Sequence, residues 1–304
     1  HEGGLCDLHP AGVDVLGRRL PDGNVAAIGT TAVRGQPTGM VVLDFSGTLS
    51  LEATRFGRDE NLRRELQGSG LWRLGVDSLE VFWGEVVNPT WLEGSTTGKG
   101  YTSLLAERVG QLAARQGREP AESDVRAAAA RFVESYLRHS TIDPEWGPVI
   151  RPLLARPGAL VVVASDHYAE ATAHIVGQLE GLGLAAAPAL EGEWARGVLV
   201  ANSADLGHHK ATREFWQRLK EAQGVGALAR VVIVDDFGAN EQPLDAYAAA
   251  EKVARRRRET VELLTAAFQA PASVFPFVLE AGSEGAYREL IRQAGRFAQS
   301  ALAG

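Results

Sequence analysis

The sequence predicts an α/β protein built on a doubly wound parallel sheet, with a block of helices inserted after the first strand. Short β-branched runs alternate with segments of helical periodicity in the second half of the chain, an order typical of parallel sheets. Between about residues 50 and 150, apolar residues instead recur at helical spacing, as in Leu104, Leu105 and Val109. Strand signals on both sides of a helical stretch indicate a core interrupted by an insertion.

We expect two domains. The core would consist of residues 1–50 and 150–304, and a helical cap domain would occupy residues 51–149. Within the core, residues 1–38 are expected to form a hairpin extension, because the turn sequence LPDGN at 20–24 separates short apolar runs.

The first strand of the predicted sheet ends on an acidic residue. Residues 41–50 read VVLDFSGTLS, so Asp44 follows a buried strand directly and a Gly-Thr turn comes just after it. Open α/β sheets bind their ligands at the carboxyl ends of their strands. A carboxylate at that edge is suited to act as a nucleophile or a metal ligand.

The remaining elements follow from runs of β-branched residues and from helical spacing. Each run is closed by polar residues or glycine, and a helix-period segment separates it from the next. We expect the last 60 or so residues to form surface helices. The predicted strands are 159–164, 198–201 and 231–234, and the predicted helices are 169–179, 212–221, 244–264 and 287–297.

Composition excludes several classes of function. The chain has 304 residues, 45% of them apolar, and a formal net charge of −7, which argues against a nucleic-acid partner. Cys6 is the single cysteine, so an internal disulfide is excluded and a reducing cytoplasm fits best. No apolar run approaches the roughly 18 residues that cross a membrane. We therefore expect a cytoplasmic monomer or homodimer that acts on a small molecule.

Polar side chains follow two further predicted strands at the edge where Asp44 lies. Residues 165–167 read SDH and residues 235–236 read DD. Crowded carboxylates repel one another unless a cation or a shared proton intervenes. Oxygen ligands favour Mg²⁺ over zinc, and Lys210 could hold a phosphate beside Asp44.

In this order, these residues resemble the haloacid dehalogenase-like (HAD) hydrolase superfamily. The four motifs of that superfamily match residues 44–49 (DFSGTL), Ser165, Lys210, and the acidic pair Asp235-Asp236 with Glu241 beyond it. The positions Asp44, Ser165, Lys210 and Asp235 are separated by 121, 45 and 25 residues, which suits a helical cap between the first two motifs. The resemblance spans about residues 38–245 and implies a Rossmann-like core.

The resemblance also implies a role for each matched residue. Asp44 would attack phosphorus and form an aspartyl-phosphate, Ser165 would bind the transferring oxygens, and Lys210 would orient both. Mg²⁺ would lie among Asp44, the backbone carbonyl of Ser46, and Asp235 or Asp236. The remaining candidates for contact with a small phosphorylated substrate are Ser46, Gly47, Thr48, Asp166, His167 and the single cap lysine, Lys99.

Ser46 departs from the pattern of the superfamily. Its phosphatases usually carry a second Asp two residues after the nucleophile, which protonates the leaving group and later activates water. A hydroxyl does not do that near neutral pH, and losing such a group typically costs about 10²- to 10⁴-fold in rate. Asp166, His167 and Glu85 are the candidate substitutes.

Three alternatives to an ordinary phosphatase stay open. The chain could transfer phosphoryl groups slowly, could cleave carbon–halogen or carbon–phosphorus bonds, or could be a binding or regulatory protein without turnover. The acidic pair at 235–236 favours a metal and a phosphorylated ligand over metal-free dehalogenation. We therefore predict a magnesium-dependent hydrolase or phosphotransferase that acts on a small phosphorylated metabolite, most simply of the phosphatase type.

Overall fold

The computed structural model describes residues 35–241, 250–279 and 284–303. Its core is a six-stranded, all-parallel sheet in the order β3-β4-β2-β1-β5-β6, so the predicted α/β fold is confirmed. The hairpin predicted for the N-terminal extension falls on residues 1–34, outside the described residues. The strands are β1 (Gly39–Leu43), β2 (Ala159–Ser165), β3 (Ala186–Pro188), β4 (Val198–Asn202), β5 (Arg230–Asp235) and β6 (Ala272–Pro276).

The three chemically important strands are neighbours at the centre of the sheet. β1 pairs with β2 on one side and with β5 on the other, and Leu43 lies level with Val163 and Val234. Asp44, one residue further on, donates its backbone N–H to the carbonyl of Val234 at 2.9 Å. Register alone therefore brings the ends of these strands to one edge.

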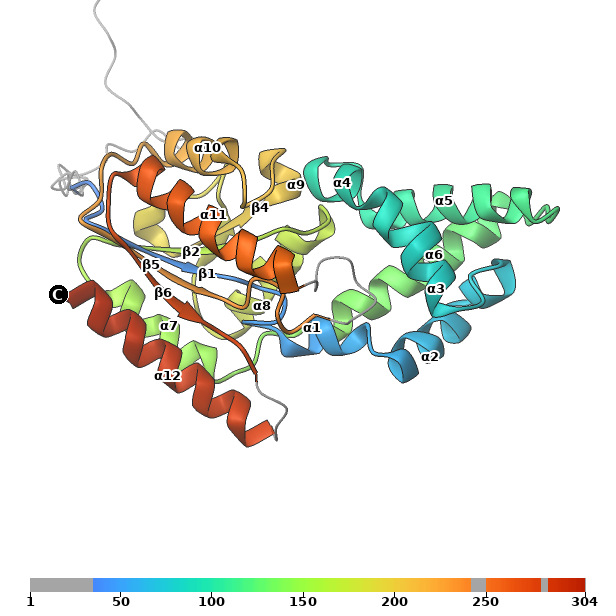
Figure 1. Cartoon of the computed structure of the whole chain (residues 1–304), viewed down its shortest axis with the longest axis horizontal. Coiled ribbons are helices and arrows are strands. Elements are labelled where there is room, and N and C mark those ends of the chain that lie inside the picture. The colour runs from blue at the N-terminus through green and yellow to red at the C-terminus, as the bar shows by residue number, and fades with distance from the viewer. Residues whose placement is uncertain (1–34, 242–249, 280–283, 304) are drawn as a thin grey trace, which may run out of the picture. The chain divides into compact units, whose positions relative to one another are not determined.

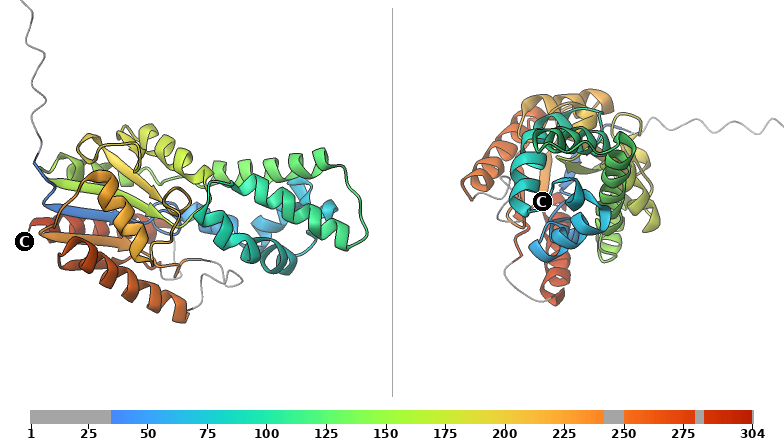
Figure 2. Two further views of the ribbon diagram at one scale, coloured as in Figure 1. Left: turned by 90° about the horizontal axis from the view of Figure 1, so that it is seen from above. Right: turned by 90° about the vertical axis from the view of Figure 1, so that its right-hand side faces the viewer.

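Helices cover both faces of the sheet, which confirms the doubly wound arrangement (Figures 1 and 2). On one face, apolar side chains of α10 and α11 pack against Met40 and Val42 of β1. On the other, α7, α8 and α12 pack against Val41 and Leu43. Because successive residues of a strand point to opposite faces, continuous apolar strands are needed to fill both layers. The helices are α7 (Trp146–Ala155), α8 (Glu170–Gly181), α9 (Ser203–Leu206), α10 (Arg213–Gln223), α11 (Ala250–Phe268) and α12 (Glu284–Ala303), with a 3₁₀ turn at Trp194–Arg196.

Residues 51–139 form a set of helices, here called the helical segment. Its apolar side chains make a separate cluster that includes Leu66, Leu104 and Phe132. The division into two domains stays a prediction, although α7, which begins at Trp146, already packs on the sheet. The helical segment consists of α1 (Leu51–Phe56), α2 (Asp59–Ser69), a 3₁₀ turn (Leu71–Leu74), α3 (Leu79–Val81), a π-helical turn (Phe82–Val87), α4 (Asn88–Thr96), α5 (Tyr101–Arg115) and α6 (Glu122–His139).

The π-helical turn has a local cause. Pro89 occupies the first turn of α4 and has no backbone N–H, so the regular ladder of hydrogen bonds is interrupted there. The preceding residues widen into a π turn, an irregularity that is frequent at functional sites. Phe82, Trp83 and Val87 of this turn all face the cavity described below.

Contacts from several elements join the helical segment to the core, among them a helix cap, a ring stack and a hydrogen bond. The carboxylate of Glu170 in α8 accepts the backbone N–H groups of Tyr101 and Thr102 at 2.8 and 3.2 Å, which caps the start of α5. The ring of Tyr101 stacks on the ring of Tyr168 with 3.9 Å between centroids. His209 Nε2 lies 2.6 Å from the hydroxyl oxygen of Ser95 in α4.

Two strands differ from the prediction. β3 is three residues long, and β6 is a half-exposed edge strand in a region expected to be helical. Both lack the long β-branched run that marks the inner strands. The final helix, α12, packs Tyr287, Ile291 and Ala294 into the core, so it is not simply a surface helix.

Among the described residues, no helix has both the length and the apolar character needed to cross a membrane.

Candidate active site

The loop after β1 is built so that Asp44 and the backbone around it face the edge of the sheet. Gly47 has φ +80°, a left-handed conformation that favours glycine, and a Cβ at this position would collide with the carboxylate of Asp236. The hydroxyl of Thr48 accepts the backbone N–H of Asp236 at 3.1 Å. Gly47 and Thr48 are therefore supports of the loop, and neither is among the residues that line the cavity.

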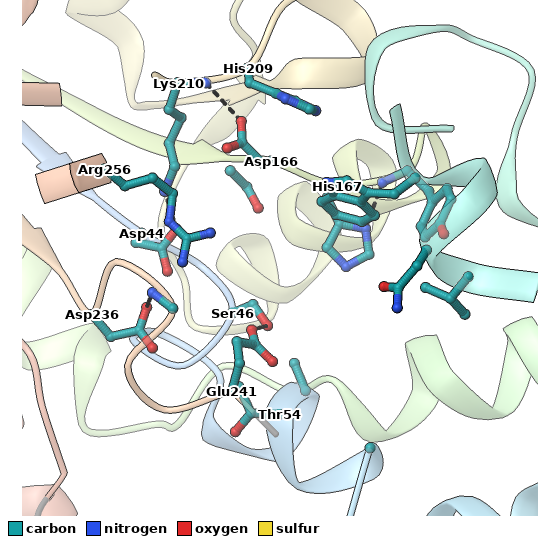
Figure 3. A pocket seen from close by; sticks show the side chains of 18 of the residues that line it. Asp44, Ser46, Thr54, Asp166, His167, His209, Lys210, Asp236, Glu241 and Arg256 are labelled. Carbon is teal, nitrogen blue, oxygen red and sulfur yellow. Dashed lines mark hydrogen bonds and ion pairs between the residues drawn. The ribbon is translucent and has the colours of Figure 1, made fainter. Parts of the chain in front are cut away.

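Lys210 is fixed by its backbone and reaches the acidic groups with its side chain. Its N–H donates to Asp166 Oδ1 at 2.8 Å, and its carbonyl accepts the indole N–H of Trp216 at 2.7 Å. Its ammonium group lies 2.5 Å from Asp44 Oδ1 and 2.9 Å from Asp235 Oδ2, and all three side chains are buried (Figure 3). The structure thus brings the predicted nucleophile and the predicted lysine into direct contact.

The carboxylates of Asp235 and Asp236 also hold the loop that follows β5. Asp235 Oδ1 accepts the N–H of Phe237, a buried residue with φ +54°. Asp236 accepts the N–H groups of Gly238 and Asn240 at 2.9 and 2.8 Å. A left-handed non-glycine backbone is held only where its surroundings over-determine it, and these bonds do so.

The electrostatics of the cluster favour a bound cation. Burial raises the pKa of Asp44 well above its ordinary value, and the neighbouring Lys210 opposes that rise. Burial, followed by the charge of Asp235, also raises the pKa of Asp236. When all three buried carboxyl groups are ionised, they outnumber the Lys210 ammonium and the Arg256 guanidinium, which Figure 3 shows directed toward Asp44, so negative charge is left for a cation to balance.

The donor set fits a hard divalent ion. Asp44, Asp235 and Asp236 each offer one oxygen, and these oxygens lie within 4.8 Å of one another. An all-oxygen set of carboxylates suits Mg²⁺ better than zinc, which prefers nitrogen and sulfur. A buried acidic cluster that could bind a metal is therefore present, as the sequence predicted.

A carboxylate from a distant part of the chain lies beside Ser46. Ser46 Oγ donates to Glu241 Oε1 at 3.0 Å, and both residues line the cavity (Figure 3). Sequence reasoning placed Glu241 in the fourth motif but did not consider it as a substitute acid. Its signal was an acidic residue six positions after Asp235, and only the fold shows that it reaches Ser46.

The segment after β2 supplies the remaining predicted residues. Ser165, Asp166 and His167 all line the cavity. His167 Nδ1 accepts the N–H of Tyr168 at 2.8 Å, so Nε2 carries the hydrogen toward Tyr136 Oη at 2.7 Å. Burial, and then the charge of His174, lowers the pKa of His167 to about 4, so the ring is neutral near pH 7.

Two candidates from the helical segment lie elsewhere. Lys99 is held at the surface by Glu93 and Glu107, at 2.9 and 2.7 Å, and the structure does not bring it to the cavity. Glu85 pairs with Arg115 at 2.8 Å and is likewise absent from the cavity lining. These ion pairs join side chains from different elements, so the sequence alone does not show which way Lys99 and Glu85 point.

The acidic cluster opens into a cavity of about 480 Å³, in the range of small-molecule sites. Aromatic side chains of the helical segment form much of its lining. One face of α11 also borders it, with residues at helical spacing: Lys252, Arg255, Arg256 and Glu259. Two residues of the basic run 255–258, Arg255 and Arg256, thus border the cavity.

Comparisons with known proteins add little beyond the fold. No protein-family model matches the chain, and no curated protein matches it either. Among solved structures, the chain is similar to a 2-haloacid dehalogenase from Pseudomonas syringae pv. Tomato DC3000, with 20% identity and a TM-score of 0.44 over 69% of this chain and 83% of that one. The chemistry of the site therefore has to follow from its own residues.

Proposed function

We propose that this protein is a magnesium-dependent hydrolase of the HAD type that cleaves a phosphate ester through an aspartyl-phosphate. The observation that carries the proposal is the contact of the buried Lys210 ammonium with Asp44 and Asp235 at the base of the cavity. A carboxylate beside a lysine and two further acids suits in-line attack on a phosphoryl group.

In the first step, a carboxylate oxygen of Asp44 forms a bond to phosphorus as the bond from phosphorus to the ester oxygen breaks. Lys210 neutralises charge on the carboxylate and on the transferring oxygens, and Ser165 donates a hydrogen bond to one of those oxygens. Asp44, Asp235 or Asp236, and the backbone carbonyl of Ser46 would hold Mg²⁺, which supplies positive charge for the phosphoryl oxygens.

Glu241 is the proposed proton donor and acceptor. Its carboxyl gives a proton to the departing ester oxygen in the first step. In the second step it takes a proton from water, whose oxygen bonds to phosphorus and releases Asp44 and inorganic phosphate. The hydrogen bond from Ser46 Oγ at 3.0 Å holds this carboxyl beside the residue that stands two positions after Asp44.

Several expectations from the sequence stay predictions. They are the phosphorylated nature of the substrate, the cytoplasmic location, the monomeric or dimeric state, and the absence of nucleic-acid and membrane partners. The acidic pair at 235–236 continues to favour a metal over metal-free dehalogenation.

The test compares the protein with Asp44→Asn, each with and without magnesium, on a generic aryl phosphate. We expect hydrolysis that requires both the metal and Asp44. Asp205→Asn is a matched control, because Asp205 is a half-buried aspartate bonded to Thr172 and does not line the cavity. Turnover that survives Asp44→Asn, or no turnover across a broad panel of phosphate esters, would contradict the proposal.

A further inference from the structure

The cavity is charged at one end and uncharged along the rest of its wall. Its ionisable base comes from the strand ends and from α11. The described part of the lining that comes from the helical segment contains no acidic, basic or histidine side chain. A ligand that fills this cavity therefore meets charge only at its phosphate end.

We propose that the substrate is a phosphate monoester whose organic part is an uncharged aromatic or branched apolar group. This inference rests on the proposed function, because it names the remainder of the same ester. It excludes sugar phosphates and other polyhydroxylated phosphates as preferred substrates.

The apolar wall is made of rings that fix one another in place. Phe56 packs edge-on against Phe132 and Tyr136, with centroids 5.5 and 5.2 Å apart. Phe82 packs against Phe132 at 5.3 Å, and Tyr101 meets Tyr136 edge-on at 6.4 Å. Rings packed in this way form a wall of fixed shape and offer faces and edges to an apolar group.

Two of the polar groups on this wall are bonded within the protein. Thr54 Oγ1 donates to the carbonyl of Leu51 at 2.8 Å, and Tyr136 Oη is bonded to His167 at 2.7 Å. Asn88 contributes an amide to the lining. Most of the wall is carbon, so a ligand with several hydroxyl groups would lose more hydrogen bonds to water than the wall replaces, which is unfavourable in a buried site.

The other end of the cavity is suited to an anion. Lys210 lies at the base, and Figure 3 shows the guanidinium group of Arg256 in α11 directed toward Asp44. Lys252 and Arg255 border the cavity from the same helix. The site is thus amphipathic along its length, cationic and metal-competent at one end and aromatic at the other.

The test uses two esters whose leaving groups have similar reactivity, phenethyl phosphate and glycerol phosphate, both esters of primary alcohols. We expect Asp44-dependent kcat/KM to be higher for phenethyl phosphate by about tenfold or more, the effect of burying one aromatic ring. Binding of naphthol, measured by calorimetry without turnover, reports on the apolar wall separately.

Trp83→Ala and Trp72→Ala are a matched pair. Both side chains are half-buried tryptophans packed on the same apolar cluster, but Trp83 lines the cavity and Trp72 does not. Trp83→Ala should lower the affinity for naphthol by roughly tenfold. It should also lower the ratio of kcat/KM for phenethyl phosphate to kcat/KM for glycerol phosphate. Trp72→Ala should leave the naphthol affinity and the ratio of the two kcat/KM values within about twofold of those of the original protein.

The outcomes separate this inference from the proposed function. Asp44-dependent hydrolysis with glycerol phosphate equal or preferred overturns the inference and leaves the proposed function standing. Naphthol binding that depends on Trp83, without hydrolysis of any ester, supports the apolar site and contradicts the proposed function. Neither binding nor hydrolysis overturns both.

Discussion

The edge of the sheet and the aromatic wall of the helical segment line the same cavity but are built by different physics. At the edge, backbone register places Asp44 level with the end of β5, and charged side chains are held by paired, directional bonds. At the wall, rings from α1, the π-helical turn, α5 and α6 meet mainly through apolar packing. The geometry of the edge should therefore be sensitive to the change of a single functional group, whereas the wall should be sensitive mainly to changes in side-chain volume.

The largest expected effect is on the reaction rate, and it tests whether replacing one functional group at the edge is enough to disrupt the site. Glu241→Gln keeps the size of the side chain and its ability to accept from Ser46 Oγ, but removes the transferable proton. We expect kcat for an alkyl phosphate to fall by roughly 10²- to 10⁴-fold, because general acid catalysis is lost. Steady-state rates for alkyl and aryl esters measure this, and the aryl ester, with its better leaving group, should lose less.

Ser46 provides the controls for that variant. Ser46→Ala leaves Glu241 in place and should cost less than Glu241→Gln. Ser46→Asp, introduced together with Glu241→Gln, should recover part of the rate, since it restores a carboxyl two residues after Asp44. An unchanged rate in Glu241→Gln would remove Glu241 from the mechanism.

The next effect concerns His167, where the edge and the wall meet. The folded protein holds the pKa of His167 at about 4, against 6.5 when exposed, so the unfolded chain binds the additional proton between these values. Stability from this group is fully present above about pH 6.5 and is lost as pH falls toward 4, by up to roughly 3 kcal/mol. Urea unfolding at a series of pH values measures the loss.

His167→Gln separates this contribution from that of the carboxylates. The variant lacks a titrating group at this position, so its free energy of unfolding should fall less steeply between pH 6.5 and 4 than that of the original protein. Parallel profiles for the two proteins would show that His167 does not titrate differently in the folded and unfolded states.

A smaller effect tests the dependence of the wall on volume. A Cβ on Gly94 of α4 would collide with the ring of Tyr168 and the side chain of Leu104. Gly94→Ala should therefore lower the free energy of unfolding by about 1–3 kcal/mol. Gly110→Ala in α5 is the control, because its Cβ would enter open space and should stabilise the helix by up to about 1 kcal/mol. Equal unfolding midpoints for the two variants would contradict tight packing at Gly94.

The smallest effect is expected at Lys99. Its carboxylate partners, Glu93 and Glu107, are about half exposed, and solvent screens such pairs strongly. Lys99→Met should leave kcat and KM within about twofold of the original values, which kinetics on the preferred ester would measure. A large rise in KM would restore the earlier expectation that Lys99 meets the substrate.

The contrast between edge and wall also explains what could be predicted from the sequence. The fold class and the placement of Asp44 and Ser165 at strand ends follow from runs such as 159–164, because parallel strands align their carboxyl ends. β6 was missed because its short, half-exposed run looks like loop sequence. Glu241 was missed because its partner, Ser46, lies 195 residues away in the chain, and loop conformation rather than periodicity brings them together.

The contacts of Glu170, Tyr168 and His209 with the helical segment affect how a ligand can enter the cavity. For the helical segment to move outward, three of these contacts have to break. They are the cap of α5 by Glu170, the stacking of Tyr101 on Tyr168, and the hydrogen bond between Ser95 and His209. The hydrogen bond between Tyr136 and His167 would have to break at the same time, so opening of the cavity would be a concerted event rather than the movement of one loop.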